Sequence, residues 1–283
     1  MPLSAAGVWF TLLALVSSGL LGCNSAAPGF GNCEVSGGRG SVKLVTLVPG
    51  ALSVRPALPA PGWWNGDSPE TIKDGFEYCM AANMAYRAGL DRVIVVNRSF
   101  AQVIAGQAQG FDIALSEITI TEERKKVLDF TEPYFDSDQG ILVRTGTPVD
   151  RDRIKHMRLA TELASTTLQY IVDRIQPLEH PSVFASAAPM YSALAAGTVD
   201  AVIWDTPNVL ARAMQSNGTL EVVGRYDMGE KWGGVLSKDS PNLPVFNQLI
   251  EEFKRDGTLD KLTRRYLTPN LGMDPARLPI FTP

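Results

Sequence analysis

The sequence predicts an α/β protein with two lobes, each built on a mainly parallel sheet. The chain has 283 residues, which is enough to bury more than one hydrophobic core. From residue 41 onward, short apolar segments of strand length alternate with longer segments of helical periodicity. Residues 110–117 and 197–205 also resemble each other, because each has a glycine and an Asp before an apolar strand that ends in polar residues. Either each lobe contributes one such strand to a shared cleft, or the likeness reflects common α/β punctuation.

The first series of elements begins with a strand at residues 43–48, followed by a proline-rich irregular loop at 51–64. A helix is expected at 71–88, because apolar side chains recur there at a spacing of four and Gly89 ends the pattern. The other elements expected in this series are a strand at 93–96, a helix at 100–109 and a strand at 111–115.

The second series begins with a strand at 158–161, after which residues 164–166 lead into a helix at 167–176. Thr206 and Pro207 form a strong helix start, because a hydroxyl can cap the helix and proline fits its first turn. The other expected elements are a strand at 180–183, a helix at 187–196, a strand at 199–203 and helices at 243–255 and 258–266.

Residues 116–135, SEITITEERKKVLDFTEPYF, give the clearest functional signal. A strand that ends in hydroxyls, including Thr119, leads into a helix start at Thr121, where backbone N–H groups are free. Arg124 lies one helical turn further, and its planar guanidinium suits a carboxylate. The segment therefore predicts an anion-binding clamp. The alternative is that Thr121 only caps its helix and Arg124 pairs with an acidic neighbour on the surface.

Composition and the N-terminal segment narrow the function classes. With 26 Lys and Arg against 30 Asp and Glu, the net charge is −4, and because no basic run stands out we expect no nucleic-acid partner. Residues 8–21 are apolar but short for a bilayer span, and the sequence Leu-Leu-Gly-Cys that ends at Cys23 resembles the lipobox of bacterial lipoproteins. The resemblance implies a signal peptide at 1–22 and lipid attachment at Cys23. No basic residue precedes Arg39, so the alternative is an uncleaved N-terminal anchor.

Residues 23–40 are rich in Gly, Ser and Ala and are expected to form a flexible tether. Two cysteines remain besides Cys23, namely Cys33 in this tether and Cys79 in the first lobe. In an oxidising compartment they suggest a disulfide that fastens the tether to the lobe. The alternative is that Cys79 is a small buried core residue.

The chain from about residue 41 to 267 resembles the extracellular solute-binding proteins of polar amino-acid ABC importers, family 3. The resemblance rests on the segments TITEERKKVLDFTEPYF, LAAGTVDAVIWDTPN, WGGVLSKDSP and FKRDGTLDKLTRRYL. Around residues 205–208 the sequence looks most similar to glutamine-binding members. The resemblance implies a two-lobed, type II periplasmic-binding-protein-like fold, in which lobes joined by two crossing strands close on a free amino acid.

The same resemblance implies a division of the chain and a set of partners. The crossings are expected near residues 139–145 and 226–235. The expected parts are lobe 1 at 41–144 and 228–267, lobe 2 at 145–227, and a C-terminal tail at 268–283. We expect a monomer without cofactor or metal, located outside the cytoplasm, that meets a free amino acid, an ABC permease and, through its lipid, the membrane.

The family's pattern, matched residue by residue, implies how the ligand is held. Arg124 would bind the α-carboxylate, assisted by Thr119 from the same lobe and by Thr166 from the opposite lobe. Asp205 would bind the α-ammonium group. The other residues expected to line the cleft are Ser116, Glu117, Glu162, Ser165, Trp204, Phe100 and, as an aromatic lid, Trp63 and Trp64.

Departures from the family's pattern bear on the ligand. The expected first strand ends in Leu-Val-Pro at 47–49 and lacks the usual acidic residue. Glu117 stands where relatives tend to have glycine or serine, and Glu162 occupies another position in the cleft. Two additional carboxylates favour a basic or amide amino acid. Alternatively, either carboxylate points away from the cleft and pairs with a neighbouring Arg or Lys.

Two other functions remain open at this point. A periplasmic cyclohexadienyl (prephenate or arogenate) dehydratase shares the fold and would need a placed acid such as Glu117 or Glu162. A lipoprotein that presents its ligand to a sensory partner is the other alternative. Because Arg124 and Asp205 together make a complete clamp for an amino acid, we expect a binding protein rather than an enzyme.

Overall fold

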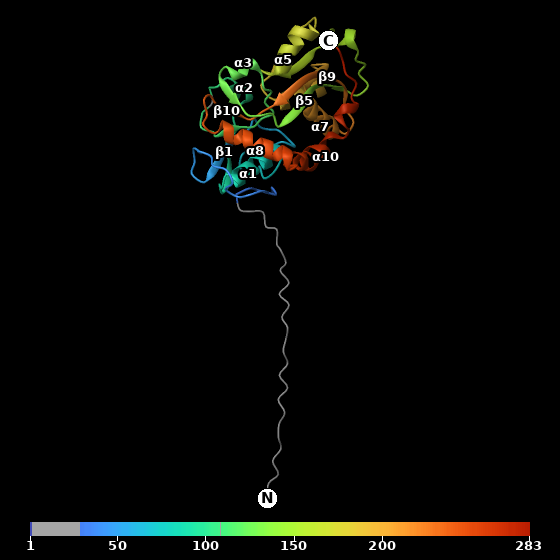
Figure 1. Cartoon of the computed structure of the whole chain (residues 1–283). Helices are drawn as coiled ribbons and strands as arrows, with labels where there is room; N and C mark the ends of the chain where they lie inside the picture. Colours follow the sequence, from blue (N-terminus) through green and yellow to red (C-terminus); the bar gives the residue numbers. More distant parts are fainter. Residues whose placement is uncertain (2–28, 108) are drawn as a thin grey trace.

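The protein consists of two α/β lobes, as the sequence predicted (Figure 1). The computed structural model describes Met1, residues 29–107 and residues 109–283. Each lobe contains one five-stranded sheet with helices packed on it. In this described part of the chain, no helix is both long and apolar enough to cross a membrane.

The first sheet is assembled from two distant parts of the chain. Its strands are β1 (Ala51–Arg55), β2 (Arg92–Val95), β3 (Ile113–Ala114), β4 (Leu128–Phe130) and β10 (Val235–Ser237). Strand β1 pairs in parallel with β2 and β3, whereas β10 lies antiparallel between β3 and β4. The helices of this lobe are α1 (Phe76–Arg87), α2 (Phe100–Ile104), α3 (Glu122–Lys125), α8 (Leu243–Arg255), α9 (Thr258–Leu262) and the π-helical turn η2 (Thr263–Leu267).

The second sheet comes from the intervening part of the chain. Its strands are β5 (Phe135–Arg144), β6 (Leu159–Glu162), β7 (Ser182–Phe184), β8 (Ala201–Asp205) and β9 (Leu220–Trp232). Strand β6 pairs in parallel with β7 and β8, and β5 lies antiparallel between β8 and β9. The helices of this lobe are α4 (Arg151–Ile154), α5 (Thr166–Tyr170), the π-helical turn η1 (Ile171–Ile175), α6 (Ala187–Ala195) and α7 (Thr206–Gln215).

The chain passes between the two sheets twice. It leaves β4 at Phe130 and enters β5 at Phe135, and it returns from β9 at Trp232 to β10 at Val235. Residues 135–144, which we expected in the first lobe, therefore form strand β5 of the second sheet, between β8 and β9. Both passages are short, so the two sheets lie close together where β4 leads into β5 and β9 leads into β10.

The first strand is β1, and the prediction of a strand at 43–48 with an irregular loop from residue 51 was wrong. In the predicted strand only Val48 forms an isolated bridge, with Ala51. Every residue of β1 is buried and the strand pairs on both sides. Its segment contains no proline, and the proline-rich loop begins only at Pro56, so all of its backbone N–H groups can take part in pairing.

Two predicted helices were too long, and glycine backbone geometry explains both. Helix α1 begins at Phe76 rather than 71, because Gly75 adopts φ 125° and ψ 164°, a conformation open only to glycine. Helix α2 ends at Ile104 rather than 109, because Gly106 adopts a left-handed φ of 66° just beyond it. Helix α8 has its predicted bounds.

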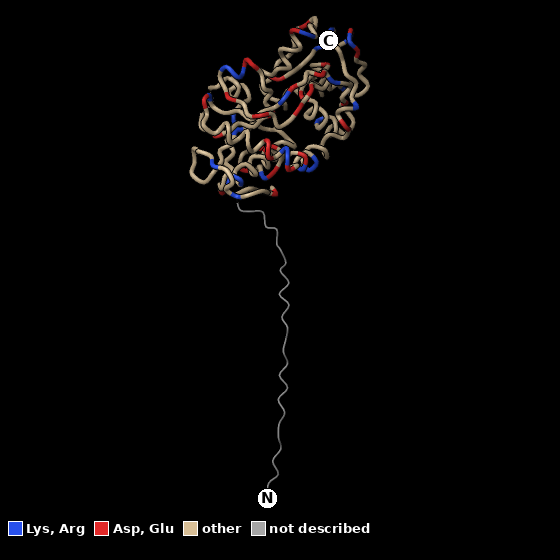
Figure 2. Tube along the Cα trace, viewed as in Figure 1, with Lys and Arg blue, Asp and Glu red and all other residues tan. Residues whose placement is uncertain are grey.

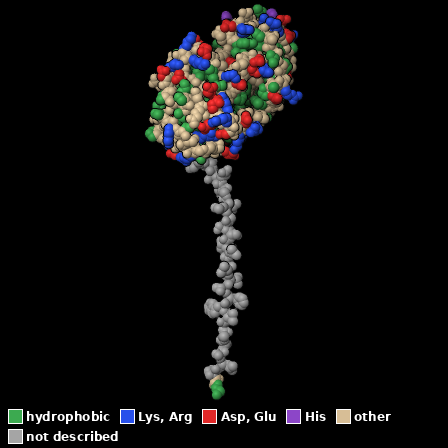
Figure 3. All heavy atoms as spheres, viewed as in Figure 1, with side chains coloured by type: hydrophobic (Ala, Val, Ile, Leu, Met, Phe, Trp, Pro, Cys, Tyr) green, Lys and Arg blue, Asp and Glu red, His purple; other side chains and the backbone are tan. Residues whose placement is uncertain are grey.

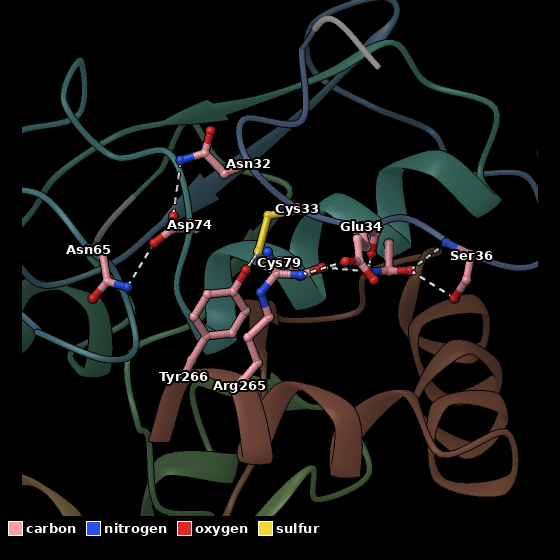
Figure 4. Close-up of a disulfide and its surroundings, with 10 residues drawn as sticks. Asn32, Cys33, Glu34, Ser36, Asn65, Asp74, Cys79, Arg265 and Tyr266 are labelled. Atoms are coloured by element: carbon pink, nitrogen blue, oxygen red, sulfur yellow. Dashed lines mark hydrogen bonds and ion pairs between the residues drawn. A yellow bond between two sulfur atoms is a disulfide. The ribbon is translucent and has the colours of Figure 1, made fainter. Parts of the chain in front are cut away.

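Residues 29–40 pack on the first lobe, so the prediction of a flexible tether was wrong for this segment. Cys33 forms a disulfide with Cys79 of α1, which decides between the two readings of these cysteines (Figure 4). Phe30 and Cys33 are almost completely buried, and Asn32 N–H donates to Lys73 O at 2.7 Å. Glu34 accepts hydrogen bonds from Lys261 and Arg265 of the C-terminal helices. The predicted signal peptide, Cys23 and residues 23–28 lie outside the described residues.

The C-terminal tail runs from the first lobe onto the second. Helix α10 (Thr268–Leu271) and the 3₁₀ turn η3 (Pro275–Arg277) follow η2. The tail then pairs with β9, because Arg225 N–H donates to Pro279 O at 2.9 Å and Phe281 N–H donates to Arg225 O at 2.8 Å. Phe281 packs in the second-lobe core beside Tyr226. The tail is therefore a further connection between the lobes, and the chain ends on the second of them (Figure 1).

Residues of both charge signs are interspersed along the chain in both lobes (Figure 2). The face drawn in space-filling form shows the same mixture, with apolar side chains scattered among the charges (Figure 3). This face thus carries no extended basic surface of the kind that binds nucleic acid.

Candidate functional site

A cavity of about 580 Å³ lies between the two lobes. Residues that follow β1, β2 and β3 line it from the first lobe, and residues at the ends of β6, β7 and β8 line it from the second. These are the carboxyl ends of parallel strands, which is where open α/β sheets bind their ligands.

Most of the predicted site residues line this cavity. They are Phe100, Ser116, Glu117, Thr119, Arg124, Glu162, Ser165, Thr166, Trp204 and Asp205. Trp63 and Trp64 do not line it, so the prediction of an aromatic lid was wrong. Both are 1% exposed, since Trp63 packs against Phe76, Phe135 and Trp232, and Trp64 Nε1–H donates to the buried Glu77 carboxylate at 2.6 Å.

Arg124 is a buried cation that feels the charges of the buried carboxylates Glu230 and Asp205 but is in direct contact with neither. Its backbone N–H donates to Thr121 Oγ1 at 3.1 Å, so Thr121 does cap α3 as one reading held. The guanidinium, however, turns away from the surface: Nη1 donates to Thr119 O at 2.7 Å and Nη2 to Ala164 O of the other lobe at 3.2 Å. It makes no ion pair with any described residue, and burial lowers its pKa. A carboxylate in the cavity would supply the missing anion.

Asp205 lies at the end of β8. Its carboxylate and that of Glu230 share a single hydrogen-bond donor, the side-chain amide of Gln139. The Gln139 side-chain amide donates to Asp205 Oδ1 at 2.8 Å and to Glu230 Oε2 at 2.7 Å. Thr166 Oγ1 donates to the other oxygen of Glu230. Burial and the charge of Glu230 hold the pKa of Asp205 well above its usual range. An ammonium group in the cavity would relieve this repulsion.

Glu117 pairs across the cleft, so it neither points away nor meets a Lys or Arg. Its carboxylate accepts a hydrogen bond from Asn208 Nδ2 of α7. Its backbone N–H donates to Glu77 Oε1 at 2.9 Å, in a left-handed conformation with φ 55°. Burial and the charges of Glu77 and Asp205 raise the pKa of Glu117 well above its usual range.

Glu162 lines the cavity at the end of β6 without a partner. Its carboxylate makes no hydrogen bond or ion pair with the described residues, and burial alone raises its pKa to about 7. Glu162 therefore does not pair with a basic residue of the described chain, so that alternative is wrong.

Sequence reasoning missed several residues that shape the site. Gln139 and Glu230 sit on β5 and β9 behind the cavity, and no local pattern singled them out. Asn208 and Arg212 could have been found, because they follow Asp205 at helical spacing on one face of α7. Tyr191 of α6 also lines the cavity, but only its contacts across the lobe reveal this.

Comparison with known proteins defines the class. The chain belongs to the bacterial extracellular solute-binding proteins, family 3, whose sequence pattern matches residues 66–269. It is 26% identical over 196 residues to the L-cystine-binding protein TcyJ of Escherichia coli K12, which covers 68% of this chain and 73% of that protein. The last part of the tail, beyond residue 269, lies outside the family match.

Solved structures give the same class. An ancestral arginine-binding protein bound to arginine superposes with a TM-score of 0.67 at 28% identity, over 77% of this chain and 98% of that one. An ancestral amino acid-binding protein described as a precursor of cyclohexadienyl dehydratase superposes with a TM-score of 0.68 at 26% identity, over 77% of this chain and 96% of that one. The type II two-lobed fold is thereby confirmed.

Proposed function

We propose that the protein binds a free polar amino acid, with a basic or amide side chain preferred, and delivers it to an ABC importer. One observation carries the proposal: Arg124 of the first lobe and Asp205 of the second line the same cavity, and neither forms an ion pair within the described residues. A zwitterion bound between them supplies a partner of opposite charge for each.

The energetics are sufficient for such a ligand. Hydrogen bonds to charged groups contribute about 1.5–3 kcal/mol each. A micromolar ligand needs about 8 kcal/mol in total. Contacts of the α-carboxylate with Arg124, Thr119 and Thr166, together with that of the α-ammonium with Asp205, reach this range.

The preference for a basic or amide side chain rests on the additional acids. Glu117 and Glu162 line the cavity together with Asp205, and burial is the main cause that raises the pKa of each. A cationic or hydrogen-bond-donating ligand side chain would stabilise their charged forms. The similarity to proteins named for binding cystine and arginine supports an amino-acid ligand.

The proposal includes export and anchoring. The chain would be cleaved before Cys23, carry a lipid there, act as a monomer outside the cytoplasm, and present its closed form to a permease. Labelling with a radioactive fatty acid tests the anchor: wild type should incorporate label and Cys23→Ala should not. Co-purification with a permease favours transport, whereas co-purification with a sensor kinase favours the ligand-presenting alternative.

A thermal-shift screen against the twenty amino acids tests the binding function, because a ligand that binds only the folded state raises the melting temperature. We expect stabilisation by a small set of polar amino acids, led by basic or amide ones. If no amino acid stabilises the protein at millimolar concentration, the proposal is wrong.

A dehydratase is the second candidate, favoured by one observation. The pKa of Glu162 lies near 7 inside the cavity, which is the range of an effective general acid. Incubation with prephenate and with arogenate tests it. Release of the aromatic product, lost in Glu162→Gln, would support the enzyme, and its absence would leave binding alone.

A further inference from the structure

The cavity extends well beyond the place where an α-amino acid group would bind. One face of α7 lines it from its first turn to its last. The residues of this face, counted from the end of β8, are Asp205, Asn208, Ala211, Arg212 and Gln215. Arg212 lies seven positions after Asp205, which corresponds to about 10 Å along a helix axis. A ligand held at Asp205 therefore has room for a second polar group near Arg212.

Two opposite charges that line this cavity have no ion-pair or hydrogen-bond partner within the described residues. Glu77, Glu117, Asp205 and Glu230 all accept hydrogen bonds from described residues. Neither Glu162 nor Arg212 forms a hydrogen bond or an ion pair with any residue in the described ranges, and Arg212 Nε is buried without an acceptor. They line the same cavity, yet they do not pair with each other.

Tyr191 lies near both Arg212 and Glu162. The Arg212 guanidinium lies 5.4 Å from the centre of the Tyr191 ring, and that ring also contacts Trp204 at 5.9 Å. Such stacking leaves the in-plane N–H groups of the guanidinium free for an anion. Burial is the main cause that raises the pKa of the Tyr191 hydroxyl. The charges of Glu117, Asp205 and Glu162 raise it further and that of Arg212 lowers it, so all four groups lie within electrostatic reach of this hydroxyl.

We propose that Glu162 and Arg212 form a second, distal subsite that takes a dipolar group, so that a double-headed amino acid binds more tightly than single-headed ones, basic and amide amino acids included. Such a molecule carries an α-amino acid group at each end of a short bridge. Its distal ammonium group binds Glu162 and its distal carboxylate binds Arg212. Arginine would satisfy only the first and glutamate only the second. This inference rests on the proposed function, because the proximal group must bind at Arg124 and Asp205.

The dimensions are consistent with a bridge of four atoms. The two α-carbons of a disulfide-bridged pair lie about 5.5–6 Å apart, and their charged groups extend further at each end. The long side chain of Arg212 covers the remaining distance from its helix to the ligand. L-Cystathionine has a bridge of this length, is inert to redox exchange and is therefore the probe of choice.

Calorimetry on the full-length exported protein tests the subsite. The ligands are L-cystathionine, L-arginine, L-glutamine and L-methionine, the last being a thioether with a single head. We expect cystathionine to bind at least about tenfold more tightly than methionine or glutamine, since two more charged groups find partners. Arg212→Met and Glu162→Gln should each reduce the ratio of cystathionine affinity to glutamine affinity by about tenfold. Arg212→Lys should restore part of the ratio.

Arg151→Gln is the matched control, because Arg151 is an exposed arginine of the same lobe that does not line the cavity, and it should leave all four affinities as in wild type. Thermal unfolding without ligand verifies that each variant is folded. If arginine or glutamine binds and cystathionine binds no more tightly, the distal subsite is wrong while the proposed function stands. An equal loss for all ligands in Arg212→Met also overturns the subsite. If none of the four ligands binds, the distal subsite is wrong, and the thermal-shift screen against the twenty amino acids decides the proposed function separately.

Discussion

Asn208 of the second lobe donates a hydrogen bond through Nδ2 to the Glu117 carboxylate of the first lobe. The same side chain accepts a hydrogen bond from Trp63 Nε1 at 2.9 Å, also from the first lobe. One amide thus joins the lobes by two hydrogen bonds at the wall of the cavity. Together with the bond from Arg124 to Ala164 O, it holds the cleft in the arrangement described.

Asn208→Ala should weaken ligand binding and loosen the contact between the lobes. It leaves the buried Glu117 carboxylate and the Trp63 indole N–H without partners, which costs about 1–3 kcal/mol for each group in the closed form. Calorimetry should show at least a fivefold loss of affinity, about 1 kcal/mol. Small-angle scattering should show a larger radius of gyration. Gln248→Ala, on the exposed side of α8, is the control and should change neither. Affinity and radius equal to those of wild type would show that this contact does not contribute to closure.

Arg124→Ala and Asp205→Ala should each reduce affinity for the amino acid by about 2–5 kcal/mol, the range for removing one partner of a buried charge pair. Arg124→Lys should retain only part of the affinity, because an ammonium group cannot form a bidentate pair. Titration calorimetry with the best ligand from the thermal screen measures both effects. Wild-type affinity in either alanine variant would show that the ligand binds elsewhere.

The stability of the ligand-free protein should decrease as pH rises from about 4.5 to 7, in part through Glu162. The folded-state pKa of this carboxyl is raised to about 7, so the folded state binds its proton more tightly than the unfolded state does. The stabilisation is therefore complete below the unfolded pKa and is lost as pH rises through 7. Glu162→Gln should flatten the decrease by about 2 kcal/mol. Urea unfolding at pH 5 and at pH 7.5 measures this, and parallel profiles for variant and wild type would contradict it.

Removing the Cys33–Cys79 disulfide should destabilise the first lobe by about 2–4 kcal/mol, as expected for a closed loop of this size. The two cysteines are separated by 46 positions, and the bond fastens residues 29–40 to α1. The double variant Cys33→Ser, Cys79→Ser should show a lower melting temperature and early proteolysis near residue 33. Unchanged melting in reducing buffer would show that the bond adds nothing to stability.

Phe281→Ala should destabilise the second lobe, because its ring packs beside Tyr226 and against Gly224, where even a Cβ would come within 2.4 Å of the ring. Half-buried aromatic contacts of this kind contribute about 1–3 kcal/mol. Ile280→Ala is the matched control, since its side chain is 57% exposed one position away in the same strand-like segment. Chemical denaturation should separate the two variants. Equal effects would mean that the tail contributes only through its backbone.

The part of the site that could be predicted depends on interactions between residues close together in the sequence. Thr121, the acidic first turn of α3 and Arg124 lie within a few positions, so capping and helical spacing predicted their arrangement. The start of α7 at Thr206 and the bounds of α8 were predictable for the same reason.

The failures share a different cause. Residues 43–48 are as apolar as a strand, but pairing on both sides selects β1 instead. Trp63 and Trp64 follow a proline-rich loop and suggested a lid, yet they fill the space between α1 and the strands that pass between the lobes. Both outcomes depend on contacts between distant residues, which no local pattern contains.

The sequence by itself determined which polar side chains stand at the ends of strands, because caps, glycine, proline and apolar periodicity act over a single turn or strand. Only the tertiary structure decided which of these groups have partners. Gln139 reaches Asp205 across 66 positions and Glu230 across 91, and Asn208 reaches Glu117 across 91. The same assembly leaves Arg124, Glu162 and Arg212 without an ion pair in the described parts of the chain, because pairing depends on how distant strands and helices come together and no local pattern encodes it.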